Sequence, residues 1–279
     1  MAFQLASSIV HYNFGKYPFE KALRNMVELG YKGTEIYPHV EILQKGRTEL
    51  KRLLDIYGLE PVTFLMGGYG INSGVRSLAD TDKQRLEETI RNYKENILLA
   101  EANGFSKMLV FPGEAPRDES DIDEAFRSAA RNLGPIADFA ADHGIEILIE
   151  TYSGALAKDA HTFLRMRELS GSENVYANVD PSNYFVVGDD VIQALKRLGS
   201  LVHGAHIKDV VRTPERYYWA PTGEGEVDFR SFLSALKSIG YEGWLVVEYE
   251  AGMSGRYYAD PERGAKESYQ YITSILKSL

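Results

Sequence analysis

Short hydrophobic runs alternate with longer amphipathic segments along the whole chain. The longer segments, such as 19–30, 82–104 and 229–240, have the spacing of helices, and each ends at a glycine, as helices prefer. The short runs are rich in branched and aromatic side chains, which favour strands. There are eight of them: FQLASSIV (3–10), GTEIY (33–37), LEPVTFLM (59–66), KMLVF (107–111), IEILIE (145–150), VYANVD (175–180), LVHGAHIKD (201–209) and WLVVEYE (244–250). A strand followed by a helix, repeated eight times, predicts a parallel sheet.

The length of the chain indicates how this sheet closes. The eight units fit within 279 residues, and (β/α)8 barrels commonly occupy roughly 250 residues as a single unit. No linker, low-complexity tract or block of like charge divides the chain. We therefore predict an α/β protein, a single (β/α)8 TIM barrel, with one domain spanning residues 1–279. A doubly wound open sheet is the structural alternative.

Composition excludes several classes of partner and site. The formal net charge is -9, from 40 acidic and 31 basic residues, which argues against nucleic acid because its binding needs clustered Lys and Arg. The chain has 0 cysteines, which excludes disulfides, thiolate metal ligands and cysteine nucleophiles. It shows neither a signal-like N-terminal segment nor an apolar span of membrane length. We expect no membrane association and a cytoplasmic location.

Polar residues end four consecutive strands of the predicted barrel. Glu150, Asp180, His206 and Glu248 each follow a hydrophobic run, and active sites of such barrels lie at the carboxyl ends of the strands. Neighbouring strands are about 4.8 Å apart, so these side chains can surround one point. Three carboxylates that close repel one another unless a cation neutralises them. The pattern therefore predicts a divalent metal site.

Each of these residues also has a plainer interpretation. A strand-end acid is often a solvated rim residue or the N-cap of the next helix, and only the set of four favours a shared site. Glu250 lies on the same face as Glu248, and we choose Glu248 because it directly follows the apolar LVV. Three carboxylates with one imidazole suit Mn²⁺ best among Mn²⁺, Mg²⁺ and Co²⁺, with Zn²⁺ as a further alternative.

Several motifs resemble those of a known family, the xylose isomerase-like barrels called sugar phosphate isomerases/epimerases, which include the ketose 3-epimerases. The resemblance covers nearly the whole chain. It is carried by LIE (148–150), NVDPSN (178–183), AHIKD (205–209), PTGEGEVDF (221–229) and GYEGWLVVEYE (240–250). In that family, the acids and the histidine that end strands five to eight bind a divalent metal. The resemblance thus implies the same four ligands as the strand-end pattern.

The resemblance also implies an activity. A metal that chelates the carbonyl and adjacent hydroxyl oxygens of a ketose acidifies the intervening C–H by stabilising the enediolate. In the ketose 3-epimerases the first and last glutamates exchange the proton, which implies that Glu150 and Glu248 are the acid/base pair here. We expect a divalent-metal-dependent isomerase or epimerase of a sugar or sugar phosphate. Its partner is a small-molecule carbohydrate, and self-association into a homo-oligomer is compatible with the sequence.

Five further residues are candidates for substrate binding. Many relatives carry Asp-x-x-His after strand six, whereas Asn183 stands at the histidine position here, and an amide cannot supply a proton at neutral pH. Arg212 lies six residues after His206 and resembles an arginine that holds a substrate oxygen in the epimerases. His11 and Glu35 follow the first two strands on the predicted active face. Trp219 can stack on a sugar ring, with simple packing as its alternative.

Two adjacent residues, Lys208 and Asp209, follow the predicted ligand His206. They can meet a phosphate or brace the barrel rim, and we favour bracing.

Three other functions remain open at this point. The same barrel supports metal-dependent lyases, such as inosose and dehydroshikimate dehydratases, in which the enolate expels a β-hydroxyl. The endonuclease IV branch requires a histidine-rich zinc site, which 6 histidines and an acidic chain do not favour. A non-catalytic barrel that binds metal and sugar is the third.

Overall fold

Eight parallel strands form a closed barrel in the computed structural model, in the order β1-β10-β7-β6-β5-β4-β3-β2. The structure describes residues 3–13, 17–37, 40–66, 77–116, 118, 121–250 and 260–279. The barrel strands are β1 (Gln4–Ser8), β2 (Gly33–Ile36), β3 (Glu60–Leu65), β4 (Lys107–Val110), β5 (Glu146–Glu150), β6 (Val175–Val179), β7 (Val202–Ile207) and β10 (Trp244–Val247). The predicted fold class is confirmed, because each of these strands falls within one of the eight hydrophobic runs.

Helices occupy the amphipathic segments between the strands. They are α1 (Val10–Asn13), α2 (Phe19–Leu29), α3 (Val40–Leu43), α4 (Glu49–Tyr57), α5 (Lys83–Ala102), α6 (Ile122–Asp142), α7 (Ala160–Ser170), α8 (Pro181–Val187), α9 (Val191–Leu198), α10 (Phe229–Ser238) and α11 (Pro261–Leu276). Aspartate side chains cap α5, α7, α8, α9, α10 and α11 by accepting backbone N–H bonds. Within the described ranges, no helix has both the length and the apolar character needed to cross a membrane.

The described chain divides into two compact units. The first comprises residues 1–36, 52–62 and 179–279, and the second comprises 37–51 and 63–178. The prediction of one domain over 1–279 stays a prediction.

The first unit contains the pairings of β1 with β2 and β10, and of β10 with β7. A small apolar cluster is formed by Ala6, Val62 and Val246, with Trp244 packed against it. Gly33 is required beside it, because a Cβ atom there would lie 2.5 Å from Val62 and 3.1 Å from Trp244. Ala6, Val62 and Val246 are buried, so the cluster forms part of the hydrophobic core.

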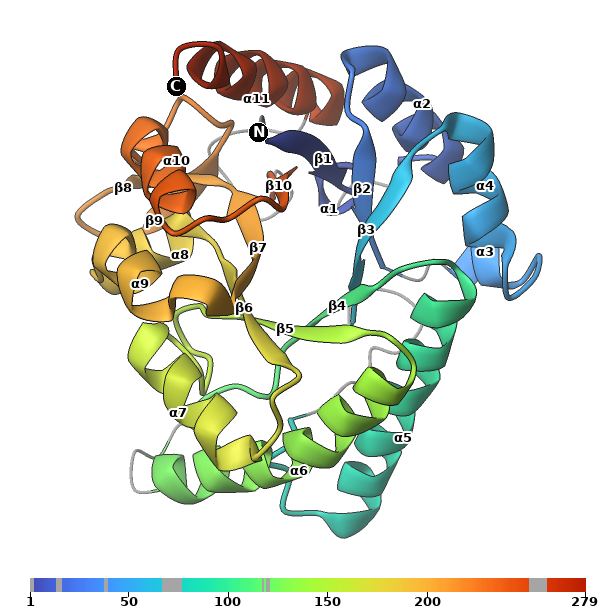
Figure 1. Ribbon diagram of the computed structural model, residues 1–279, viewed down its shortest axis with the longest axis vertical. Helices are drawn as coiled ribbons and strands as arrows, with labels where there is room; N and C mark the ends of the chain where they lie inside the picture. The colour runs from blue at the N-terminus through green and yellow to red at the C-terminus, as the bar shows by residue number, and fades with distance from the viewer. Residues whose placement is uncertain are drawn as a thin grey trace. The chain divides into compact units, whose positions relative to one another are not determined.

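The second unit contains the pairing of β4 with β3 and β5, and of β5 with β6. In Figure 1, α6 lies between α5 and α7 beside these strands. The side chains of Ile147, Leu148 and Ile149 are fully buried, so β5 is apolar on both faces until it reaches Glu150. That pattern is expected of a parallel strand covered on both sides.

A short antiparallel hairpin, β8 (Asp209–Arg212) with β9 (Tyr217–Ala220), was not expected from the sequence. The hydrophobic run 201–209 continues through both β7 and the start of β8, and the break between them at Lys208 is not visible in the pattern. Asp209 explains the local geometry. Its carboxylate accepts backbone N–H bonds from Gly223, Gly225 and Val227, which confirms that it braces the rim.

Candidate metal centre

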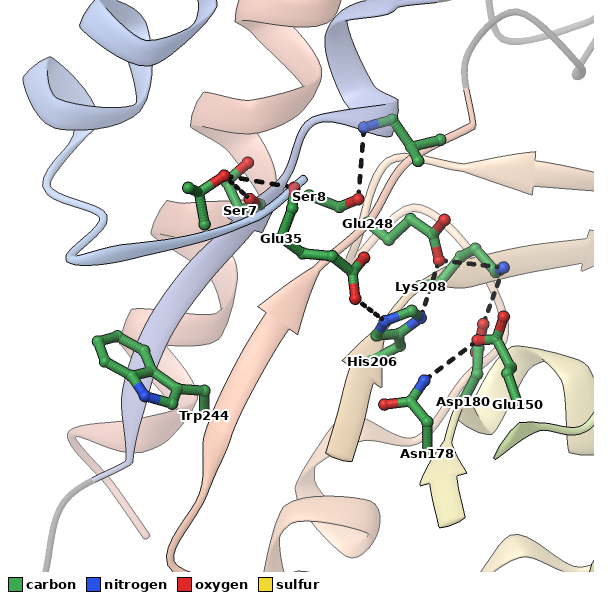
Figure 2. A network of polar contacts seen from close by, with 12 residues as sticks. Ser7, Ser8, Glu35, Glu150, Asn178, Asp180, His206, Lys208, Trp244 and Glu248 are labelled. Atoms are coloured by element: carbon green, nitrogen blue, oxygen red, sulfur yellow. Dashed lines mark hydrogen bonds and ion pairs between the residues drawn. The ribbon is translucent and has the colours of Figure 1, made fainter. Parts of the chain in front are cut away.

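His206 lies between two carboxylates at the end of β7. Its Nε2 lies 3.0 Å from Oε2 of Glu35, and its Nδ1 lies 3.0 Å from Oε2 of Glu248 (Figure 2). The side chains of His206 and Glu35 are 1% and 0% exposed. In β2, Glu35 pairs with Ser8 of β1, and its fully buried side chain contacts the imidazole. One ring nitrogen is thereby oriented by Glu35 while the other faces Glu248.

Asp180 uses its two carboxylate oxygens for different purposes. Its Oδ1 accepts bonds from the backbone N–H of Ser182 at 2.8 Å and from the Ser182 hydroxyl at 2.7 Å, which caps α8. Its Oδ2 lies 2.8 Å from Nζ of Lys208. The plain interpretation as an N-cap and the ligand interpretation are therefore compatible, because each needs only one oxygen.

Lys208 is a buried cation among acids. Its Nζ lies 3.3 Å from Oε2 of Glu248 and 3.3 Å from Oε1 of Glu250, in addition to Asp180. The ammonium also lies 4.6 Å from the ring centroid of Trp219 in β9. One residue, Ile207, separates Lys208 from His206, so strand periodicity directs both side chains to one face. The sequence predicts only that Lys208 braces the rim. Its place among the candidate ligands was missed, although the spacing from His206 was a usable signal.

The electrostatics of Glu248 follow from these neighbours. Burial acts to raise its pKa, but the ammonium of Lys208 and the ring of His206 outweigh burial and hold the pKa below its ordinary value. Glu248 is therefore a carboxylate at neutral pH. An ionised carboxylate is the form required of a metal ligand or of a general base.

Glu150 is the last residue of β5 and is buried. Its Oε1 accepts a bond of 3.4 Å from the side-chain amide of Asn178. Glu150, Asp180, His206 and Glu248 each offer one ligand atom, and these atoms all lie within 4.8 Å of one another. The structure thus brings together the four residues that the strand-end pattern singled out.

This donor set fits a divalent ion. It supplies three carboxylates and one imidazole, all buried, and Oδ2 of Asp180 takes no part in the cap and pairs with Lys208. Oxygen-rich sets with one imidazole match Mn²⁺, Mg²⁺ and Co²⁺, and Zn²⁺ accepts the same ligand types.

The four other residues expected to bind substrate occupy different surroundings. Asn183 is buried in the first turn of α8, three residues after Asp180. The guanidinium of Arg212 donates to the carbonyl oxygen of Phe185 and lies over its ring at 4.5 Å. Arg212 is thus turned toward α8 in the structure. Its role in holding a substrate oxygen stays a prediction.

His11 and Trp219 are both buried. The His11 ring meets the Tyr249 ring edge-on, with centroids 5.9 Å apart. Burial lowers the pKa of His11 to about 4, and the carboxylate of Glu248 opposes this only partly. His11 is therefore neutral at pH 7, near one predicted ligand. The Trp219 ring contacts the ammonium of Lys208, so sugar stacking on Trp219 stays a prediction.

Comparison with known proteins agrees with this architecture. The model of the family described as xylose isomerase-like TIM barrel matches residues 23–275. Among curated proteins, an inosose dehydratase of Mesomycoplasma hyopneumoniae strain J is 24% identical over 292 aligned positions, covering 94% of this chain and 90% of the relative. An inosose dehydratase of Geobacillus kaustophilus is also 24% identical, with 94% and 89% coverage.

Solved structures share the fold at low sequence identity. An L-ribulose 3-epimerase superposes with a TM-score of 0.82 at 17% identity, covering 100% of this chain and 95% of that one. The IOLI protein with a bound zinc atom superposes with a TM-score of 0.81 at 18% identity, covering 99% and 98%. At such identities the likeness concerns the fold alone.

Proposed function

This chain belongs to the xylose isomerase-like TIM barrel family, and we propose that it is a divalent-metal-dependent isomerase or epimerase of a ketose-type carbohydrate. The observation that carries the proposal is the buried cluster of Glu150, Asp180, His206 and Glu248, whose ligand atoms lie within 4.8 Å of one another. Superposable structures named L-ribulose 3-epimerase and D-allulose 3-epimerase support the class of reaction.

These four residues would hold the ion, with Mn²⁺ as the first choice. A divalent ion bound there would polarise a substrate carbonyl and so acidify the neighbouring C–H. Asp180 would contribute Oδ2, because Oδ1 caps α8. His206 would contribute Nδ1, because Glu35 contacts Nε2 and fixes the orientation of the ring.

Glu150 and Glu248 are the proposed acid/base pair. Both are buried, and the pKa of Glu248 is held below its ordinary value, so it begins the reaction as a carboxylate able to accept a proton. Glu150 ends β5 and Glu248 follows β10. A proton removed by one glutamate and returned by the other inverts the carbon, whereas its return to the adjacent carbon would interconvert aldose and ketose.

Dehydration is a second candidate, favoured by the curated relatives named inosose dehydratase. It begins with the same removal of a proton next to a carbonyl. The C–O bond to the β-hydroxyl then breaks, a C=C bond forms, and the hydroxyl leaves as water after protonation. Both candidates therefore use one site and differ only in the fate of the carbanion.

One experiment tests both candidates. The protein is loaded with Mn²⁺, its metal content is determined by elemental analysis, and it is incubated in D₂O with a panel of 2-ketoses and cyclic keto-polyols. Deuterium on the carbon next to the carbonyl, without loss of water, supports the epimerase or isomerase. Loss of water from the substrate supports the dehydratase. A protein that holds Mn²⁺ and gives neither result on any compound contradicts both and favours a non-catalytic barrel.

A further inference from the structure

Lys208 places a fixed positive charge at the oxygens proposed to hold the ion. Its side chain is 3% exposed, and Nζ lies 2.8 Å from Oδ2 of Asp180 and 3.3 Å from Oε2 of Glu248. Because Oδ1 of Asp180 already accepts two bonds from Ser182, Oδ2 is the oxygen left for a cation. A divalent ion bound by Asp180 and Glu248 would therefore bind the same carboxylate oxygens that contact this ammonium.

Two further groups contact the ammonium. Glu250 contributes Oε1 at 3.3 Å, and the Trp219 ring centroid lies 4.6 Å away. A carboxylate and an indole face both attract an ammonium. Lys208 is thus anchored by groups that are not proposed ligands, and it can remain beside an ion without losing all its partners.

The charges of the site explain what such a cation would do. The carboxylates of Glu150, Asp180 and Glu248 carry three negative charges, of which a divalent ion would balance two. One negative charge is left over, and removal of a proton from a neutral substrate moves a negative charge from the accepting glutamate to the substrate oxygen, where an unbalanced buried charge is costly. A positive charge on Lys208 offsets the remaining negative charge, while it also repels a metal ion at short range.

We propose that Lys208 is a charge-balancing positioning residue, whose ammonium shares the carboxylates of Asp180 and Glu248 with the divalent ion, weakening metal binding while favouring proton removal from the substrate. This inference rests on the proposed function and adds a second cation to the same site. The inference predicts opposite changes in two measured quantities. Loss of the Lys208 charge should increase the affinity for the divalent ion and decrease the rate of the reaction.

The test compares Lys208→Met with the wild type by calorimetric titration of Mn²⁺ in the absence of substrate. Removal of a unit charge a few ångströms from the ion should tighten Mn²⁺ binding by about tenfold or more. Lys208→Arg keeps the charge and should bind Mn²⁺ within about threefold of the wild type. The matched control is Lys107→Met, because Lys107 in β4 is a half-buried lysine paired with Glu146 at 3.9 Å, and its loss should leave Mn²⁺ affinity unchanged.

A second measurement separates charge balance from a purely structural role. At saturating Mn²⁺, proton exchange in D₂O should fall by about tenfold or more in Lys208→Met, because the nearby positive charge that offsets the negative charge of the site is lost. A structural defect would weaken metal binding and exchange together. If Lys208→Met does not fold, Lys208→Gln supplies the same neutral test with a retained hydrogen-bond donor.

The outcomes are distinct. Unchanged or weaker Mn²⁺ binding by a folded, neutral variant overturns the inference about Lys208 and leaves the proposed function standing. Unchanged exchange at saturating Mn²⁺ also overturns it. A wild-type protein that binds no divalent ion contradicts the proposed function itself.

Discussion

Glu35 and His206 form a buried pair although 171 positions separate them in the chain, with Oε2 of Glu35 lying 3.0 Å from Nε2 of His206. Histidines that ligate metals commonly direct their second ring nitrogen to a carboxylate, which fixes the tautomer and the ring orientation. Glu35 was expected to bind sugar hydroxyls. Its complete burial beside the imidazole favours the role of orienting His206.

Replacement of Glu35 should therefore weaken metal binding. Loss of such a carboxylate partner typically costs about 10- to 100-fold in metal affinity, and we expect this for Glu35→Ala. Glu35→Gln should be milder, because the amide oxygen can still accept a bond from the ring N–H. Mn²⁺ titration without substrate measures both, with Glu146→Gln at the opposite end of β5 as the control. Wild-type affinity in Glu35→Ala would contradict the assignment.

The two roles of Asp180 can be separated by one substitution. Asp180→Ser should keep the N-cap of α8, because serine caps helices about as well as aspartate, and the unfolding free energy should change by no more than roughly 1 kcal/mol. It removes the carboxylate, so Mn²⁺ affinity should fall by orders of magnitude. Chemical denaturation and Mn²⁺ titration on the same preparations measure the two effects. Asp228→Ser, which changes the cap of α10, is the control expected to keep metal binding.

The acid/base pair predicts a specific loss of proton exchange. Glu150→Gln and Glu248→Gln each keep one oxygen able to ligate but remove the base, so exchange in D₂O should fall by about 10²- to 10⁴-fold. Elemental analysis should show that metal is retained at least in part. A variant that holds metal and exchanges at the wild-type rate would exclude its glutamate from the proton transfer, and Glu250 would be the next residue to replace.

Asn183 tests substrate selection. It is buried in the first turn of α8, close in sequence to Asp180. We expect Asn183→His to change the ratio of kcat/KM values between ketoses more than it changes the melting temperature, because an imidazole differs from an amide mainly in its hydrogen bonds and its ability to carry a proton. An unaltered preference across the same panel of ketoses would show that Asn183 serves the loop alone.

His11 predicts a dependence of stability on pH. Its pKa is about 4 in the folded protein and about 6.5 when unfolded, so only the unfolded chain binds the proton between these values. The contribution of neutral His11 to the free energy of unfolding is fully present above pH 6.5. It is lost as the pH falls toward 4, by up to roughly 3 kcal/mol. His11→Phe should flatten this loss, measured by urea denaturation from pH 7.5 to 4.5. His143→Gln, which changes a partly exposed ring paired with Glu101, serves as the control.

The positions of the strands were readable from local pattern alone. Each strand is a hydrophobic run flanked by polar helix-forming sequence, and strand boundaries in the structure differ from those runs by only a few residues. The hydrophobic pattern did not predict the hairpin of β8 and β9, because its first strand continues the apolar run of β7. The strand-end acids could also be predicted from the sequence, since each is a charged residue that directly follows a hydrophobic run.

Only the tertiary structure decided which groups surround the strand-end residues: Glu35 beside His206, Lys208 among Asp180, Glu248 and Glu250, and Arg212 against Phe185. The face of the sheet on which a side chain lies can be predicted from the sequence, because side chains alternate along a strand and this alternation involves only neighbouring residues. Contacts between side chains from distant segments depend on strand register and barrel closure, which no local pattern contains.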